Sequence, residues 1–299
     1  MTAPDPAVEL VLAARNATIA GGLGVRRALP QARRRMVGPF VFVDQMGPAS
    51  LPEEHETAVL PHPHIGLSTI TYLFEGEGLH RDSLGCVQRI LPGEVNWMTA
   101  GRGIVHSERL RPGPSGRMFG VQIWVALPRH MEEVEPSFQH YGADAVPVLE
   151  GDRVVTRVIA GALLGARSKV QTSSPLFYAE ARMEAGAALE LRPEYEERAV
   201  YLLRGAVTVA ETALAPGELA VLQPGADVQV RASEPAMVLL LGGEPLDGPR
   251  HISWNFVSSS EERLQEAARD WRAQRFPRVP GETRYLPLPE DGDEPVNYP

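Results

Sequence analysis

The chain has 299 residues, yet it contains a single cysteine, Cys86, and no long apolar run near its N-terminus. One cysteine cannot form an internal disulfide, and it excludes a zinc site built from four thiolates. Because charged side chains interrupt the first twenty residues, we expect neither a secretory signal nor a membrane span. These absences together predict a cytoplasmic protein that has no membrane partner.

Basic side chains are also scarce, with 29 Lys and Arg against 38 Asp and Glu and a formal net charge of -9. The phosphate backbone repels such a protein, so direct nucleic-acid binding is not expected. The hydrophobic share of 43% and the charged share of 22% are those of a folded globular protein and not of a disordered one. The length suffices for two domains of roughly 150 residues each.

Short apolar segments separated by turns dominate residues 67–127. The segments LSTITYLF, CVQRIL and MFGVQIWVAL are rich in β-branched and aromatic residues, and Gly or Pro occupies most of the breaks. This pattern is typical of antiparallel strands in a sandwich or barrel, and it argues against a helical bundle. We therefore predict an all-β fold.

The same rhythm occurs twice along the chain. The motif YLFEG at 72–76 has a counterpart in YLLRG at 201–205, and PGE at 92–94 has a counterpart in PGE at 216–218. Both pairs keep their internal order, and the segment between them is slightly shorter in the second copy. Since loops accept such changes readily, the pattern indicates an internal repeat.

Two tripeptides in the first copy carry metal-binding side chains at positions i and i+2: His62-Pro63-His64 and His106-Ser107-Glu108. On a β-strand this spacing points both side chains to one face. Two such strands facing each other would bring three imidazoles and one carboxylate to one point, a donor set suited to a divalent transition metal. Pro63 removes a ladder donor, so its segment should be an edge, a bulge or the start of a strand.

The second copy lacks these side chains. The positions that match His62, His64, His106 and Glu108 are Leu191, Pro193, Val230 and Ala232. None of these can replace its counterpart as a side-chain ligand, so packing of the repeat does not require the four residues. Four ligands on an octahedral metal would leave two positions open for a substrate oxygen and dioxygen, whereas a closed tetrahedral zinc would be structural.

Other polar residues leave alternatives open. His80 could act as an acid beside the metal ligands or be an ordinary hairpin histidine, and we favour the second role. Gln122 and Trp124 either line a pocket or pack one face of a barrel, and we favour packing. The remaining histidines have no partner at metal spacing: His55, His130, His140 and His251.

The last part of the chain changes character. The spacing of Leu264, Ala267, Ala268 and Trp271 predicts an amphipathic helix with Trp271 in the core, and Ser259 with Glu262 would form its capping box. The proline-rich residues 277–299 should lie extended over the surface or fray.

At this point the chain shows a resemblance to a known family. The segments PHPHIGLSTITYLFEGEGLHRDSLG and LPGEVNWMTAGRGIVHSE resemble the pirin family of the cupin superfamily. The segments VRRALPQARRRMVGPFVFVDQMGP and HISWNFVSSSEER also resemble pirin sequences, so the similarity covers nearly the whole chain.

The resemblance implies two cupin barrels packed together with a short C-terminal helix. Residues 1–135 would form the metal-binding domain, and residues 150–299 would form a cupin domain without metal ligands that includes the helix and tail. The pirin ligands fall on His62, His64, His106 and Glu108, and the metal is expected to be Fe(II), with Ni, Cu, Zn, Mn or Co as alternatives.

Two departures from the family pattern concern residues near these ligands. Many pirins carry Glu where this chain has Ser68 and Thr69, and they commonly have His at the position of Gln45. Neither departure affects the four expected ligands.

The resemblance leaves three functions open. The first is a dioxygenase of the quercetin 2,3-dioxygenase type, which opens a flavonol ring with O2 and releases carbon monoxide, with Glu108 accepting the substrate's hydroxyl proton. The second is a non-catalytic regulator that depends on iron or its redox state and acts through protein partners. The third is a structural metal without turnover. We rank them in this order.

Overall fold

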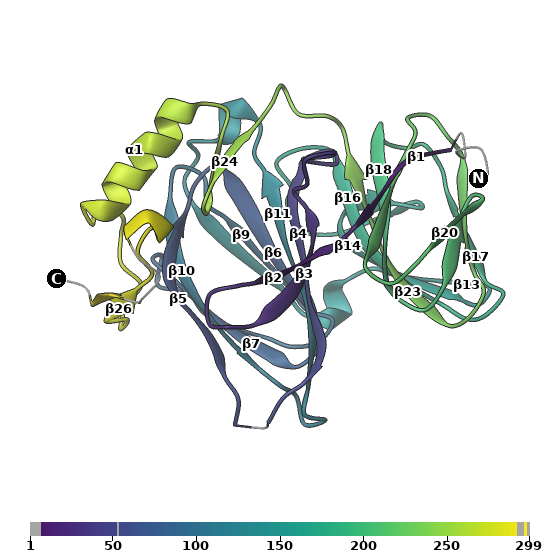
Figure 1. The fold of residues 1–299 in the computed structure, drawn as a ribbon, viewed down its shortest axis with the longest axis horizontal. Coiled ribbons are helices and arrows are strands. Elements are labelled where there is room, and N and C mark those ends of the chain that lie inside the picture. Colours follow the sequence, from purple (N-terminus) through teal and green to yellow (C-terminus); the bar gives the residue numbers. More distant parts are fainter. Residues whose placement is uncertain (1–6, 53, 292–295, 298–299) are drawn as a thin grey trace. The chain divides into compact units, whose positions relative to one another are not determined.

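The computed structural model describes residues 7–52 and 54–291 and the backbone of 296–297, and most of its elements are β-strands (Figure 1). The all-β prediction is therefore confirmed. The strands form two barrels that interleave along the sequence, in contrast to the two contiguous domains expected from the sequence. Barrel A comprises Ala17–Val25, Met46–Ala143 and Asp247–Pro299, and barrel B comprises Met1–Asn16, Arg26–Gln45 and Asp144–Leu246.

Barrel A is built from a small and a large sheet. The small sheet has the order β5 (Thr57–His64), β10 (Ile104–Arg111), β7 (Glu77–Asp82), β8 (Val87–Ile90). The large sheet has the order β12 (Ser137–Tyr141), β9 (Val95–Thr99), β6 (Leu67–Glu75), β11 (Arg117–Ala126), β4 (Phe40–Ser50), β3 (Gly24–Leu29), β2 (Arg15–Thr18). The division between the barrels falls within β2, β3 and β4.

Barrel B repeats this arrangement. Its small sheet has the order β17 (Ala188–Leu191), β22 (Val228–Ala232), β19 (Val207–Val209), β20 (Thr212–Leu214). Its large sheet has the order β1 (Val8–Ala13), β21 (Glu218–Leu222), β18 (Glu197–Arg204), β23 (Ala236–Gly243), β16 (Leu176–Met183), β14 (Val154–Leu163), β13 (Val148–Gly151), and β15 (Ala166–Arg167) pairs with β14.

The order of strands supports the internal repeat. The small sheets correspond strand by strand, so that β5, β10 and β7 match β17, β22 and β19. In the large sheets the run β9, β6, β11 matches β21, β18, β23, and the repeated YLFEG and YLLRG motifs fall on β6 and β18. The same scaffold is therefore built twice, and differences between the copies at matched positions do not arise from the fold.

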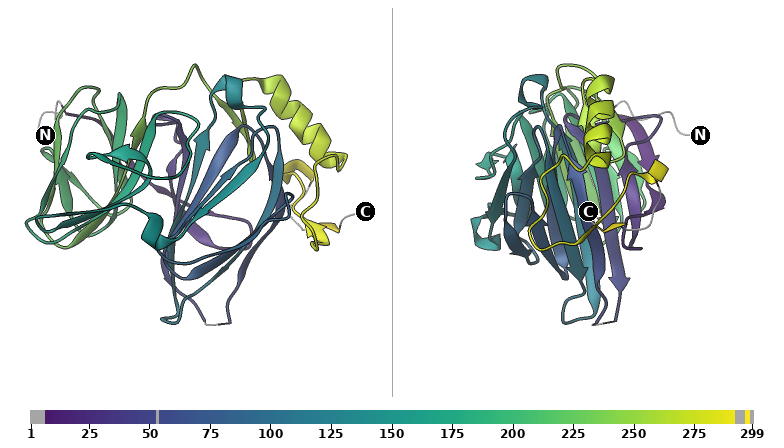
Figure 2. Two further views of the ribbon diagram at one scale, coloured as in Figure 1. Left: turned by 180° about the vertical axis from the view of Figure 1, so that it is seen from behind. Right: turned by 90° about the vertical axis from the view of Figure 1, so that its left-hand side faces the viewer.

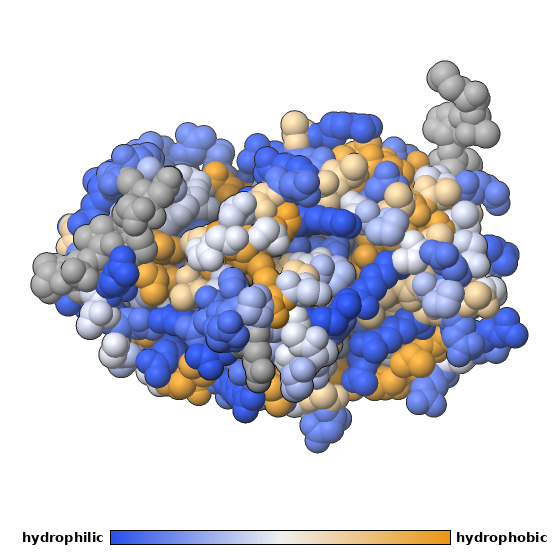
Figure 3. Space-filling model, turned by 60° about the horizontal axis from the view of Figure 1, so that its bottom comes forward, coloured by the Kyte–Doolittle hydropathy of each residue, from blue (hydrophilic) through white to orange (hydrophobic). Residues whose placement is uncertain are grey.

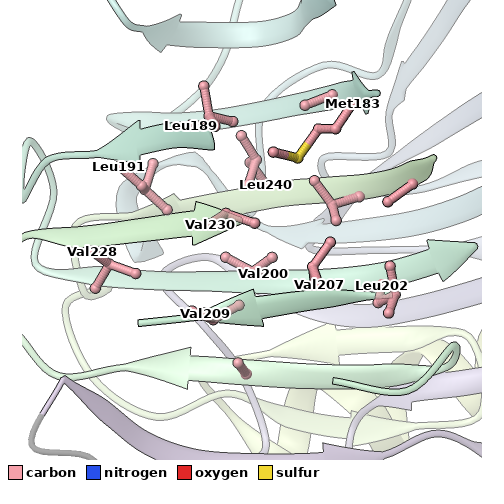
Figure 4. Close-up of a cluster of buried hydrophobic side chains, with 14 of the residues drawn as sticks. Met183, Leu189, Leu191, Val200, Leu202, Val207, Val209, Val228, Val230 and Leu240 are labelled. Carbon is pink, nitrogen blue, oxygen red and sulfur yellow. The ribbon is translucent and has the colours of Figure 1, made fainter. Parts of the chain in front are cut away.

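The interior of barrel B is filled by aliphatic side chains. Side chains from both of its sheets point toward one another in Figure 4, among them Leu189, Val230 and Leu240. Three of the four positions predicted to lack ligands, Leu191, Val230 and Ala232, belong to this buried cluster, whereas Pro193 is exposed.

The helix α1 (Glu261–Arg272) buries Leu264, Ala267 and Trp271, as its spacing predicts. Its N-cap is Ser260 and not Ser259, and the Ser260 hydroxyl accepts a hydrogen bond from the backbone N–H of Arg263, so the predicted capping box of Ser259 and Glu262 does not form. Ser259 lies outside the helix because its N–H and hydroxyl donate to Glu132 instead.

The helix packs against barrel A, although the sequence placed it with the C-terminal domain (Figure 2). Its buried face joins Ile65 and Val105, which flank the predicted metal ligands, and Phe256 of the hairpin formed by β24 (His251–Ser253) and β25 (Phe256–Ser258). The described residues also contain three short 3-10 turns: Arg129–Met131, Ala143–Ala145 and Pro289–Asp291.

The proline-rich segment after α1 also belongs to barrel A. Val279 and Leu288 are buried with the helix, the Leu286 N–H donates to the Pro61 carbonyl, and Glu282 accepts hydrogen bonds from Arg109. Its strand β26 (Arg284–Tyr285) pairs with β27 (Val296–Asn297). Residues 292–295 and 298–299, to which the tail prediction also applies, lie outside the described residues.

Hydrophilic and hydrophobic residues are interspersed on the face drawn in Figure 3. Within the described part of the chain, no helix has the length and apolar character needed to cross a membrane.

The packing of barrel B generates a stability prediction. Leu240→Ala empties a fully buried position, and we expect it to lower the free energy of unfolding by about 2–5 kcal/mol because a cavity remains. Leu84→Ala is the matched control, since Leu84 is 50% exposed and its loss should change stability by less than about 0.5 kcal/mol. Urea titration followed by circular dichroism measures both, and equal effects would contradict the packing account.

Candidate metal centre

Strands β5 and β10 bring three of the predicted ligands together. They pair antiparallel, with His106 opposite His62 and Ile104 opposite His64. The three imidazoles are buried, and one nitrogen from each lies within 4.8 Å of the other two. Their ring centroids are 4.4–5.0 Å apart. The i, i+2 spacing thus brings three imidazoles together, and the predicted fourth member, Glu108, is not among them.

The edge position of β5 explains how His62 is held. Strand β5 is the edge of the small sheet, as Pro63 predicts, and its register with β10 shifts between His62 and Val59. Such a bulge leaves backbone groups without a ladder partner. Here the Leu60 carbonyl accepts a hydrogen bond from the Nδ1–H of His62 at 2.8 Å.

His64 is held by a segment almost two hundred residues away in the sequence. Its Nδ1–H donates to the Asn255 carbonyl at 3.0 Å, in the turn between β24 and β25. Gly66 permits this hairpin to approach, because it has a φ of +67° and a Cβ there would lie 1.9 Å from the Val257 carbonyl oxygen. The Trp124 ring packs edge-on against His64 with the centroids 5.2 Å apart.

The protonation of these rings fits a bound cation. A carbonyl oxygen only accepts, so His62 and His64 carry their proton on Nδ1 and present a lone pair at Nε2. The Nε2 atoms of His64 and His106 lie 3.1 Å apart. Two ligands at about 2.1 Å from one metal, at right angles, have nitrogens about 3 Å apart. The spacing therefore matches two positions on a single metal ion.

The electrostatic setting keeps the three rings neutral. Burial lowers the pKa of His62 to about 4, and it also lowers the pKa of His64 and of His106 well below the ordinary value, with the neighbouring histidines adding to the effect. Neutral imidazole is the form that binds a metal. Three buried, neutral and convergent imidazoles are suited to a divalent transition metal.

Glu108 is not brought into the histidine group. It lies on β10 two residues after His106, and among the described residues only the three histidines meet at ligand distance. The Thr71 hydroxyl lies 3.2 Å from its Oε1 and 2.9 Å from the Gln122 amide oxygen. Burial raises the pKa of Glu108. The assignment of this carboxylate as a fourth ligand therefore stays a prediction.

Several residues that the sequence left open are placed by the structure. His80 is buried and its Nδ1 lies 3.4 Å from His106 Nδ1, so it adjoins the site. Gln122 accepts a hydrogen bond from Thr71, whose hydroxyl also lies near Glu108, and Trp124 packs against the His64 ring. Among the other histidines, His130 is exposed and does not belong to this group.

Hydrogen bonds hold residues at both departures from the family pattern. Ser68 exchanges a hydrogen bond with Thr99 on β9 at 3.0 Å, and Gln45 accepts a hydrogen bond from Tyr201 within barrel B at 2.8 Å. Sequence reasoning did not identify the supporting groups of the site. The one local signal was His80 with Asp82, which repeats the i, i+2 spacing, whereas the Asn255 carbonyl leaves no signature in the sequence.

The chain matches known proteins along most of its length. Residues 22–125 match the family profile described as Pirin, and residues 178–277 match that of the Pirin C-terminal cupin domain. A pirin-like protein from Caulobacter vibrioides is 49% identical over 290 residues, which cover 95% of this chain and 100% of that protein. Pirin of Rattus norvegicus is 33% identical over 276 residues, 89% of this chain and 91% of its own.

A solved structure extends the comparison to the fold. Quercetin 2,3-dioxygenase from Acinetobacter baumannii superposes with a TM-score of 0.84 at 35% identity and covers 91% of each chain. The prediction of two cupin barrels is confirmed by these matches.

The convergence predicts the effect of removing one imidazole. We expect His106→Ala to bind Zn²⁺ at least about 100-fold more weakly than the unaltered chain, because a metal ligand contributes more than the groups that support it. His130→Ala, which removes an exposed histidine, is the matched control and should bind as before. Competition with a chromogenic chelator measures both affinities, and tight Zn²⁺ binding by His106→Ala would contradict the site.

Proposed function

The chain belongs to the pirin family, and we propose that it is a metal-dependent dioxygenase of the quercetin 2,3-dioxygenase type. The observation that carries the proposal is the convergence of three buried, neutral imidazoles in one barrel, while the matched barrel is filled with aliphatic side chains. The 35% identical Acinetobacter baumannii structure, named as quercetin 2,3-dioxygenase, supports this choice of reaction.

In the proposed site His62, His64 and His106 hold the metal through Nε2. Fe(II) is the proposed ion, and nickel, copper, zinc, manganese and cobalt are also compatible with three nitrogen donors. A divalent metal bound there supplies Lewis-acid polarisation of a substrate oxygen and, for a redox-active ion, one-electron chemistry with O2.

Glu108 is the proposed catalytic base. It lies two residues beyond His106 on β10 and opposite His80 of β7. Because burial raises its pKa, the carboxylate accepts a proton more readily than an exposed one. We assign it the hydroxyl proton of a flavonol-like substrate, whose anion then reacts with O2 as the ring opens and carbon monoxide leaves.

The neighbouring side chains limit how Glu108 moves. The Thr71 hydroxyl lies within hydrogen-bond distance of both Glu108 and Gln122, so a single group can donate to one of them at a time. A donation from Thr71 to Gln122 leaves Glu108 free to turn toward the histidines. We therefore assign Glu108 two roles. It accepts the substrate's proton, and when it turns toward the histidines it serves as a fourth metal ligand.

The proposal predicts oxygen-dependent turnover. The metal-free protein, reconstituted anaerobically with Fe(II), should consume one O2 for each quercetin lost once air is admitted. Glu108→Gln keeps the size of the side chain but removes the base, so the turnover rate should fall about 10²- to 10⁴-fold. Glu150→Gln, an exposed change in barrel B, is the matched control and should leave the rate unaltered. An oxygen electrode and flavonol absorbance measure the two reactants.

Other outcomes would distinguish the alternatives. Absence of turnover with Fe, Ni, Cu, Zn, Mn and Co, despite bound metal, would contradict the dioxygenase. Binding of a protein partner that depends on the iron oxidation state would then support the regulatory function instead. A metal without turnover whose removal unfolds barrel A would indicate a structural ion.

A further inference from the structure

A second polar pair lies behind the metal-binding face of His106. His80 and Asp82 occupy positions i and i+2 of β7, the strand that pairs with β10, with Asp82 opposite His106 and His80 opposite Glu108. His80 is 5% exposed and Asp82 is fully buried. The His80 ring stacks on Phe138 with the centroids 4.4 Å apart, which fixes its plane.

Asp82 determines where the proton of His80 lies. Its Oδ1 accepts the backbone N–H groups of Leu84 at 2.9 Å and Cys86 at 3.1 Å, which orients the carboxylate. Its Oδ2 lies 2.9 Å from His80 Nε2. A carboxylate only accepts, so His80 donates to Asp82 from Nε2, and the tautomer with its single proton there has a lone pair at Nδ1.

The lone pair at His80 Nδ1 faces the ring of His106. His80 Nδ1 lies 3.4 Å from His106 Nδ1, so with this tautomer of His80 the Nδ1–H of His106 is the donor. An imidazole that donates from Nδ1 and binds a metal has its lone pair at Nε2, and Nε2 of His106 lies 3.1 Å from His64 Nε2.

We propose that Asp82 and His80 form a hydrogen-bonded relay that fixes His106 in its metal-binding tautomer, and thereby act as positioning residues for the metal. The inference rests on the proposed metal site and assigns the third imidazole a support equivalent to the Leu60 and Asn255 carbonyls of the other two. Groups of this kind typically change metal affinity by about 10- to 100-fold.

The second barrel shows that the fold does not need this pair. The register of β22 with β19 places Val209 opposite Val230 and Val207 opposite Ala232. With β22 matched to β10, Val209 corresponds to Asp82 and Val207 to His80. Both valines belong to the buried aliphatic cluster. Burying a carboxylate and an imidazole instead is costly unless they are paired, so the polar pair is associated with the histidine site.

Asp82→Asn tests the direction of the relay with little change in shape. The new amide oxygen still accepts from Leu84 and Cys86, and its NH2 group then faces His80 and donates to Nε2. The proton of His80 is displaced to Nδ1, and His106 must accept there and carry its own proton on Nε2, the atom needed for metal. We expect Zn²⁺ affinity to fall about 10- to 100-fold in a chelator competition.

A double-mutant cycle separates this effect from a structural one. In a His80→Gln background the amide can present either its oxygen or its NH2 group to His106, so Asp82→Asn should cost less than about threefold in Zn²⁺ affinity. If Asp82 merely anchors the turn through Leu84 and Cys86, the loss will be the same in both backgrounds, and the relay is refuted.

Nitrogen-15 NMR of the histidine rings in the metal-free chain reads the tautomer directly. We expect the proton of His106 on Nδ1 in the unaltered chain and on Nε2 in Asp82→Asn. A proton on His106 Nε2, or two protons on His80, in the unaltered chain would overturn the proposal even if the variants failed to fold. Failure of the unaltered chain to bind Zn²⁺ would instead refute the metal site itself.

Discussion

The site depends on one constraint, namely that a buried imidazole must satisfy both ring nitrogens. Carbonyl oxygens of Leu60 and Asn255 accept from Nδ1 of His62 and His64. These acceptors leave Nε2 as a lone-pair donor on each ring, and the Nε2 atoms of His64 and His106 face each other at 3.1 Å. Two buried lone pairs at that distance repel, which is the physical ground for proposing a shared cation between them.

The duplication of the barrel shows what the fold itself requires. The small sheets of the two barrels have the same strand order, yet β17, β22 and β19 bury leucine, valine and alanine where β5, β10 and β7 bury histidine and aspartate. Aliphatic packing stabilises barrel B without polar partners. The polar interior of barrel A is therefore better explained by the chemistry it supports than by stability.

Features that depend on local spacing were predictable from the sequence. Strand alternation, the repeated motifs and the two i, i+2 tripeptides gave the all-β fold, the duplication and the convergence of three histidines. The edge position of β5 followed from Pro63, since proline cannot donate within a ladder. The helix was also located by its periodicity. Its N-cap is one residue later than predicted, because Ser259 donates hydrogen bonds to Glu132.

Features that depend on distant parts of the chain were not predictable. The Asn255 carbonyl can accept from His64 because the hairpin of β24 and β25 packs against Gly66. No local sequence pattern predicts that contact. The attachment of α1 to barrel A likewise depends on tertiary burial of Trp271. Whether Glu108 points at the histidines is a matter of side-chain rotation, which spacing on a strand does not determine.

The central claim is that Nε2 atoms of His62, His64 and His106 bind one metal ion, and that barrel B binds none. An anomalous difference map from crystals soaked in Zn²⁺, collected at the zinc absorption edge, tests it most directly. The account predicts one strong peak about 2.1 Å from all three Nε2 atoms and none within barrel B. A strongest peak elsewhere, or a zinc ion held through Nδ1 of His62 or His64, would contradict it.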